Sequence, residues 1–284
     1  MADQLVIQDG RVVVTTEEGR KIERSEAHLL AMLRREFVPP LDAAALPDGT
    51  KFLEWRDPVL LLVHQMSPQV RLLRWIKADS RRPFGPGTKY RQVRLSIPYA
   101  ITFATYIRHG KHLFLANWND LYFRNEPLRS LGDRLSFPAL LNISRILLPK
   151  REAAWICTQH LQRTGIAGWT EQLAVLLDHT WNGAFNLSSE HHEGASWYTL
   201  SQGVHQDLHP VQRWEQATAA DEAFALKVPW KPAPLTVGEL MDCLLQQHDD
   251  AERVEWLAWP RPAKSRASLV HRFLNFVQGS KEHS

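Results

Sequence analysis

Two cysteines, Cys157 and Cys243, are the strongest candidate nucleophiles in this sequence. A cysteine reacts as its thiolate, which a nearby cationic group stabilises. Cys157 lies in the segment WICTQHL, between a Lys-Arg pair and His160, whereas Cys243 lies among leucines and a methionine at helical spacing. The second setting favours packing in a core. The sequence therefore predicts Cys157 as the candidate thiol nucleophile, with burial as a small apolar side chain as the alternative.

Other catalytic motifs are missing from the sequence, which has no Gly-x-Ser-x-Gly segment, Walker loop or His-Glu-x-x-His helix. Its thirteen histidines include His191, His192, His205 and His209, which lack cysteine or acidic partners at the spacing of metal ligands. We interpret these histidines as solvated surface residues. The sequence therefore predicts neither a metal site nor a bound cofactor.

Composition limits the class of protein. The chain has 284 residues, of which 44% are hydrophobic and 23% are charged, as in ordinary globular proteins. Two cysteines are too few for a disulfide framework, and the sequence contains neither a signal-peptide pattern nor an apolar run long enough to cross a membrane. We therefore expect a cytoplasmic protein without a membrane partner. The net charge of +3 is too small to predict nucleic-acid binding by itself.

Alternating apolar residues and turn residues predict several strands. Asp9-Gly10 lies between two alternating segments and predicts an N-terminal β-hairpin. A second hairpin is expected to turn at Ser67-Pro68, and residues 79–89 (DSRRPFGPGTK) have the composition of an exposed flexible loop. Strands are expected at residues 5–7, 12–16, 58–66, 70–76, 97–107 and 112–118.

Helices are expected on both sides of these strands. Ser25 is a candidate N-cap for a helix over residues 26–35. Leucines and a tryptophan at three- and four-residue spacing predict an amphipathic helix that begins near Trp169 and has about four turns. Residues 121–142 lack periodicity and contain prolines and a glycine, so we expect a long loop, which is usually functional in a compact domain. Further helices are expected at residues 190–200, 236–247 and 268–277.

The order of four short motifs resembles the ubiquitin-conjugating (E2) enzymes. Leu-Asn-Ile at residues 141–143 and Ile156-Cys157 are followed by Gly168-Trp169 and then by a helix that contains Leu176-Leu177. E2 enzymes have a His-Pro-Asn motif, an Ile-Cys-Leu motif, a tryptophan and a Leu-Leu helix in the same order. The chain looks most like the divergent prokaryotic E2-like families represented by protein B of the PRTRC system. The similarity covers approximately residues 24–200.

The resemblance implies a role for each matching residue. Cys157 would accept the C-terminus of a ubiquitin-like modifier as a thioester. Asn142 would stabilise the oxyanion of the aminolysis step or order the active-site loop. Trp169 would be the structural tryptophan of the family, and Ser189 would help to deprotonate the incoming lysine.

Three departures from the E2 pattern are visible in the sequence. Leu140-Leu141 replaces the His-Pro pair, and Thr158 replaces the usual leucine or glycine after the cysteine. Asn142 precedes Cys157 by fifteen positions, which is further than in most E2 enzymes.

The resemblance also implies a fold, an activity and partners. We expect an α+β protein with a UBC (E2-like) antiparallel β-meander flanked by helices. The expected domains are an N-terminal β-hairpin extension (1–23), an E2-like core (24–203) and a C-terminal helical extension (204–284). The implied activity is acyl transfer in a bacterial ubiquitin-like system. Its partners would be an E1-like adenylating enzyme, a ubiquitin-like modifier and, as a further candidate, a deconjugating peptidase.

Two alternatives from other classes stay open. The E2-like fold could serve as a catalytically inactive scaffold or binding module, which the altered His-Pro-Asn motif favours and the retained cysteine does not. The chain could instead associate with nucleic acid through Arg81-Arg82 and a basic C-terminal helix, although a solvated cationic surface is the simpler explanation. The basic residues are Arg272 in that predicted helix and Arg261, Lys264 and Arg266 in the segment before it.

Overall fold

The computed structural model describes the strands at residues 4–8, 11–15 and 21–25, together with residues 46–56, 58–109, 112–158, 161 and 168–251. The chain divides into two compact units, Met1–Asp249 and Asp250–Ser284, and the description below concerns the first. The helices expected at residues 26–35 and 268–277 lie outside the described residues.

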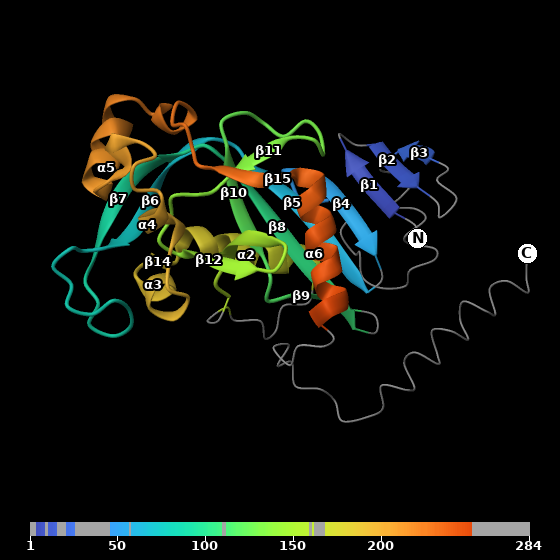
Figure 1. The fold of residues 1–284 in the computed structure, drawn as a ribbon, viewed down its shortest axis with the longest axis horizontal. Helices are drawn as coiled ribbons and strands as arrows, with labels where there is room; N and C mark the ends of the chain where they lie inside the picture. Colours follow the sequence, from blue (N-terminus) through green and yellow to red (C-terminus); the bar gives the residue numbers. More distant parts are fainter. Residues whose placement is uncertain are drawn as a thin grey trace, which may run out of the picture. The chain divides into compact units, whose positions relative to one another are not determined.

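The protein has an α+β fold built mostly from antiparallel strands (Figure 1). Its larger sheet contains β1 (Gln4–Gln8), β2 (Arg11–Thr15), β3 (Lys21–Ser25), β4 (Thr50–Arg56), β5 (Val59–Met66), β8 (Tyr99–His109), β9 (His112–Leu115), β10 (Asp120–Arg124), β11 (Arg134–Ser136), β12 (Ile143–Leu148), β13 (Arg151–Ile156) and β15 (Pro232–Thr236). The order along the sheet is β12-β13-β10-β8-β5-β4-β1-β2-β3, with β9 paired to β8 and with β11 paired to both β10 and β15. A smaller sheet has the order β14 (Ala184–Phe185), β6 (Gln69–Ile76), β7 (Tyr90–Ile97), in which β14 is parallel to β6.

One long, bent hairpin joins the two sheets. β5 continues into β6, β7 continues into β8, and the pairing register is the same on both sides of the break. Pro68 and Pro98 therefore lie opposite each other. The hydrogen-bond ladder is interrupted at this position because proline has no amide hydrogen to donate. The prediction that Ser67-Pro68 turns a hairpin between its flanking strands is wrong, since both strands run on in the same direction. The true turn is the segment 77–89.

The N-terminal strands pair as the Asp9-Gly10 signal predicts. β1 and β2 are antiparallel, with Leu5 opposite Val14. A third strand, β3, which the sequence did not predict, continues this meander beside β2. β1 joins the rest of the sheet through β4, where Val6 lies opposite Glu54.

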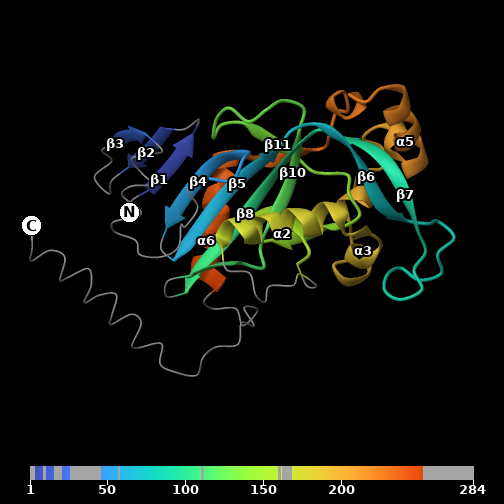
Figure 2. The same ribbon diagram turned by 180° about the vertical axis from the view of Figure 1, so that it is seen from behind.

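Two long helices cover opposite faces of the larger sheet (Figures 1 and 2). These two helices are α2 (Trp169–Asn182) and α6 (Val237–Ala251). The shorter elements are the helices α3 (Ser188–His192), α4 (Trp197–Leu200) and α5 (Val211–Ala220) and the 3-10 turns η1 (Gln206–Leu208) and η2 (Phe224–Leu226). On one face, Tyr106 of β8 packs edge-on against Trp169 of α2, with ring centroids 5.9 Å apart. On the other face, Arg151 of β13 donates a hydrogen bond to Gln247 of α6 (3.1 Å). The amphipathic helix expected from Trp169 and the helix expected at 236–247 are thereby confirmed.

The outer edge of β7 is covered by α5. The main-chain amide of Arg94 donates to Glu215 Oε1 (3.2 Å), and that of Ser96 donates to Thr218 Oγ1 (2.9 Å). These side chains satisfy amides that an exposed edge strand would offer to another chain. α5 therefore acts as a cap on the smaller sheet.

The segment after Gly203 is integrated with the rest of the first unit. β15 pairs with β11, and α5 packs on β7, and the first compact unit extends to Asp249. β15 also adds a strand to the C-terminal extension, in which the sequence predicts only helices as regular elements. No helix within the described residues combines the length and the apolar character that crossing a membrane requires.

Candidate functional site

The β12–β13 hairpin brings two predicted site residues to one end of the sheet. Ile143 of β12 lies opposite Ile156 of β13. Asn142 directly precedes β12, and Cys157 directly follows β13, so both lie at the open end of this hairpin. The fifteen positions that separate them in sequence are thus a hairpin that returns the chain to its starting point.

Cys157 is half-buried, and its main chain is fixed on two sides. Its carbonyl oxygen accepts a hydrogen bond from Nε2 of His179, in the last turn of α2 (2.7 Å). The amide of Ile156 donates to the carbonyl oxygen of Asn119 (2.8 Å), and the Trp155 indole donates to that of Asn117 (2.8 Å). The segment that bears the thiol is therefore anchored both to the connection between β9 and β10 and to α2.

Asn142 is also bonded to the last turn of α2. Its Nδ2 donates to the carbonyl oxygen of Thr180 (2.7 Å), and its Oδ1 is buried without a hydrogen-bond partner among the described residues. Since a carbonyl oxygen only accepts, the amide nitrogen must be the atom that faces Thr180. One amide hydrogen thus joins the start of β12 to α2, and the second is the one that could serve an oxyanion.

His179 is a site residue that the sequence reasoning missed. It is one of thirteen histidines, and its contact with Cys157 spans 22 positions of the chain. The available signal was its position in the last turn of a predicted helix, where the negative end of the helix dipole favours a basic side chain. The neighbouring residue that the sequence did single out, His160, lies outside the described residues.

Ser189 lies in a different environment from Cys157. It is buried in α3, with 1% of its surface exposed, and its hydroxyl accepts a hydrogen bond from Ser144 of β12 (2.9 Å). Ser144 also lies within hydrogen-bond distance of Glu193 Oε2 (3.2 Å), and burial raises the pKa of Glu193. These contacts tie α3 to β12, and the proton-transfer role of Ser189 stays a prediction.

The remaining predicted residues have packing environments. Trp169 is 2% exposed and forms the first turn of α2 against the core. Cys243 is half-buried on α6, beside the buried leucines Leu240 and Leu244. The distinction between the two cysteines therefore rests on position: Cys157 follows a strand end, and Cys243 lies within a helix.

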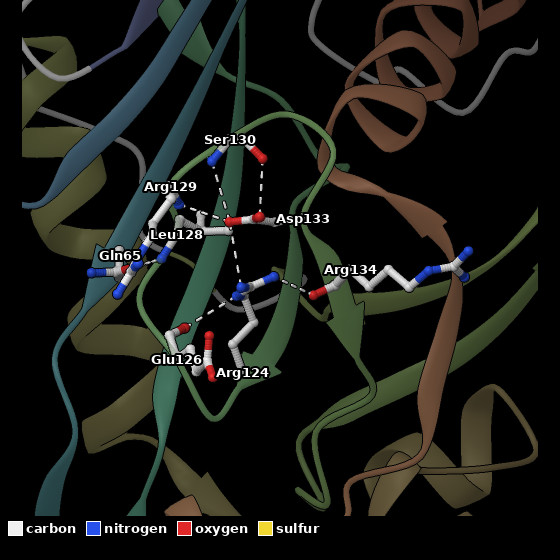
Figure 3. Close-up of polar contacts among 8 residues, drawn as sticks. All are labelled: Gln65, Arg124, Glu126, Leu128, Arg129, Ser130, Asp133 and Arg134. Atoms are coloured by element: carbon white, nitrogen blue, oxygen red, sulfur yellow. Dashed lines mark hydrogen bonds and ion pairs between the residues drawn. The ribbon is translucent and has the colours of Figure 1, made fainter.

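The segment 121–142, expected as an irregular loop, contains strands β10 and β11 and a tightly bonded turn between them (Figure 3). Asp133 accepts hydrogen bonds from the amides of Arg129 (2.7 Å) and Ser130 (3.2 Å) and from the Ser130 hydroxyl (3.0 Å). Arg124 pairs with Asp133 (3.3 Å), and the amide of Leu128 donates to Gln65 Oε1 of β5 (2.6 Å). Every group in this cluster bonds to its own loop or sheet, which describes a structural clamp.

The histidines divide by environment. His191 and His192 are exposed, in agreement with the prediction of surface residues. His205 and His209 are half-buried, and His209 Nε2 lies 2.8 Å from the hydroxyl of Ser201, so these two are only partly solvated. Within the described part of the chain, no three His, Cys, Asp or Glu side chains gather as a metal site would require.

Comparisons with known proteins add no relative: no family description matches the chain, and neither curated proteins nor solved structures yield a match. Function must therefore be argued from the residues and their geometry.

Proposed function

We propose that this protein is an E2-like conjugating enzyme that carries a ubiquitin-like modifier as a thioester on Cys157. The observation that carries the proposal is the placement of Asn142 and Cys157 at one end of the β12–β13 hairpin, both bonded to the last turn of α2. The E2 resemblance assigns the thioester to this cysteine and the amide donor to this asparagine. The hairpin explains how the two can work together despite their separation in sequence.

The proposed reaction has two steps, and neither changes an oxidation state. The thiolate of Cys157 attacks the carbonyl carbon of a modifier that an E1-like enzyme has activated as a thioester, and the donor sulfur leaves as a thiolate. An amine then attacks the same carbon, loses its proton to solvent and forms an amide as the bond to Cys157 breaks. Both steps pass through an oxyanion, which an amide hydrogen of Asn142 would stabilise.

A UBC-like core is part of the same proposal. A strand pair, a cysteine and an amphipathic helix follow one another in the order of the E2 fold, and Trp169 is buried where that helix begins. On this interpretation, the β12–β13 hairpin and the strands β1 to β3 are additions to the E2 core. The β12–β13 hairpin would account for the long spacing between Asn142 and Cys157.

Adduct chemistry with the E1-like enzyme and the modifier tests the proposal. The wild-type chain should form an adduct that thiol reductants cleave, Cys157→Ser should form an ester that resists them, and Cys157→Ala should form none. Cys243→Ser is the matched control and should behave as wild type. An adduct that persists in Cys157→Ala would contradict the assignment.

An E2-like binding scaffold without catalysis is the second candidate. The bond from Asn142 to Thr180 favours it, because this bond already uses one amide hydrogen for structure. A scaffold would bind the modifier equally well in wild type and in Cys157→Ala, and would form no adduct in either. Measuring binding and adduct formation on the same samples separates the two candidates.

A further inference from the structure

The hairpin arm formed by β6, the turn 77–89 and β7 concentrates positive charge. Residues 69–97 contain eight basic residues and one acidic residue, although the whole chain has a net charge of only +3. Lysines and arginines clustered on one feature create a local potential that the overall charge conceals. The basic residues of the arm are Arg71, Arg74, Lys77, Arg81, Arg82, Lys89, Arg91 and Arg94.

Part of this charge is neutralised, and part is not. Arg91 pairs with Glu215 (2.9 Å), Arg94 pairs with Glu222 (2.6 Å), and Lys89 lies 3.5 Å from Asp79. The other five basic residues form no ion pair with any described residue, namely Arg71, Arg74, Lys77, Arg81 and Arg82. These unneutralised charges lie along β6 and into the turn.

The turn at the end of the arm is largely exposed, as its composition predicts, and several contacts hold its main chain. The Arg82 guanidinium donates to the carbonyl oxygen of Pro86 (2.8 Å), and the amide of Leu187 donates to the carbonyl oxygen of Pro83 (3.1 Å). Phe84 packs against His191 of α3, with ring centroids 5.3 Å apart. The basic groups of the turn are therefore presented on a fixed backbone, which lowers the entropy lost on binding.

An open pocket of about 370 Å³ lies at this arm, between β6, β7 and the end of α2. It falls within the range of roughly 300–1,000 Å³ that is typical of ligand sites. The Arg74 guanidinium lies 4.5 Å from the centroid of the Tyr90 ring, so the two form a stacked, cationic platform at the pocket. The polar and aromatic residues that line the pocket include Arg74, Tyr90, Gln92, Trp181 and Asn182.

We propose that the β6–β7 arm binds single-stranded nucleic acid, with the backbone along the unneutralised basic residues and a base in the pocket. Guanidinium groups suit phosphates, planar aromatic and guanidinium groups suit the faces of unstacked bases, and the Gln92 amide suits base edges. The Asn182 amide nitrogen already donates to Asp178 (2.6 Å), so its oxygen is the atom left to accept from a base. An acidic peptide would use the charge but not the platform or the amides. This combination selects nucleic acid among anionic partners, independently of the function proposed for Cys157.

Fluorescence anisotropy with the full-length protein and a short labelled oligothymidylate tests the proposal. Binding should be detectable at low salt and weaken as salt rises. Arg74→Gln should weaken binding and lower the slope of log K against log salt by about 0.7, the value for one phosphate contact in a single strand. Tyr90→Leu should weaken binding about 5-fold or more without changing that slope, and Tyr90→Phe, which keeps the ring, should bind as wild type.

The matched control is Arg134→Gln. Arg134 is an exposed arginine on β11, and its side chain extends away from the neighbouring polar cluster (Figure 3). An equal loss of affinity in Arg134→Gln and Arg74→Gln would show an unspecific charge effect and overturn the proposal. Absence of binding at low salt would also overturn the proposal. Competition is the last check: if polyglutamate displaces the labelled oligonucleotide as effectively as unlabelled oligothymidylate does, the site recognises only negative charge and the proposal is wrong.

Discussion

Asp133 is the residue on which the turn between β10 and β11 depends most. Its carboxylate accepts three hydrogen bonds from Arg129 and Ser130 and pairs with Arg124, with 19% of the side chain exposed. We expect Asp133→Asn to lower the free energy of unfolding by about 1–2 kcal/mol, because hydrogen bonds to a charged acceptor are stronger than those to an amide. Urea denaturation at neutral pH measures the change. Ser130→Ala, which removes one of the three bonds, should have a smaller effect.

The contribution of Asp133 should also depend on pH. Burial alone would raise its pKa, but the donors from Arg129 and Ser130 and the charge of Arg124 outweigh burial and lower it. On acidification, Asp133 is therefore protonated in the unfolded chain before it is protonated in the folded protein. Its contribution to the free energy of unfolding is complete above the usual aspartate pKa and is lost as the pH falls through the lower pKa of the folded protein. The stability difference between wild type and Asp133→Asn should shrink in acid. A difference that stays constant down to that range would contradict the assignment.

His64 should make the protein less stable in mildly acidic solution. It is 8% exposed on β5, and burial lowers its pKa, opposed in part by a hydrogen bond to the main chain of Asp48. Below the usual histidine pKa the unfolded chain binds a proton that the folded protein does not. The free energy of unfolding should therefore fall by up to about 1.4 kcal/mol per pH unit until the folded pKa is reached. Urea titrations of wild type and His64→Gln should diverge in this window, and parallel curves would refute the prediction.

At the residue scale, the sequence predicted chemical types better than environments. Cys157 and Asn142 could be proposed as site residues because motif order is a property of the sequence. His179 could not, since its role arises from a contact between a helix end and a strand end. Ser189 was located by a loose alignment, and burial against Ser144 became visible only once α3 was placed on β12.

At the element scale, the last turn of α2 positions the candidate site. We expect His179→Leu to remove the bond to the Cys157 carbonyl oxygen and lower stability by about 1 kcal/mol, the usual net value of such a bond. The loosened segment should expose the thiol more often, so Cys157 should react faster with iodoacetamide. Mass spectrometry of the labelled chain measures this rate, with Cys243 as the internal reference. Equal acceleration at both cysteines would indicate general unfolding and not a local anchor.

Proline shows why element boundaries were predicted better than their pairing. Pro68 was interpreted as a turn, because proline interrupts a strand in either a turn or a broken ladder. A turn and a broken ladder can be told apart only from the residue opposite Pro68 in the neighbouring strand. That residue is Pro98, which lies thirty positions further along the chain. β10 and β11 were missed for a related reason: they are short, and their places are set by pairing with β8 and β15.

At the scale of the whole molecule, the α+β class followed from the mixture of alternating and helical periods, whereas the order of strands did not. Neighbours in the larger sheet include β4 with β1, β10 with β8 and β15 with β11. The last of these pairs joins segments about a hundred residues apart. Such contacts are selected by how buried surfaces fit together, which no local pattern reports.

Arg151 links the layers of the molecule, and its loss should affect the whole unit. Its guanidinium pairs with Asp120 of β10 and donates to Gln247 of α6, and the side chains of the ion pair are 2% and 0% exposed. Arg151→Met leaves the Asp120 carboxylate buried without its cation, which typically costs about 3–5 kcal/mol. Urea unfolding followed by tryptophan fluorescence and by far-UV circular dichroism should show one transition at a lower midpoint by both probes.

Two variants separate the charge effect from lost packing. Adding Asp120→Asn to Arg151→Met removes the stranded charge, so the double variant should recover part of the stability. Lys150→Met changes the neighbouring exposed cation, whose Nζ contacts Gln246 of α6 (3.1 Å), and should alter stability by less than about 0.5 kcal/mol. If the double variant is no more stable than Arg151→Met, packing and not the uncompensated carboxylate sets the cost. If the two probes report separate transitions, α6 and the sheet do not unfold as one cooperative unit.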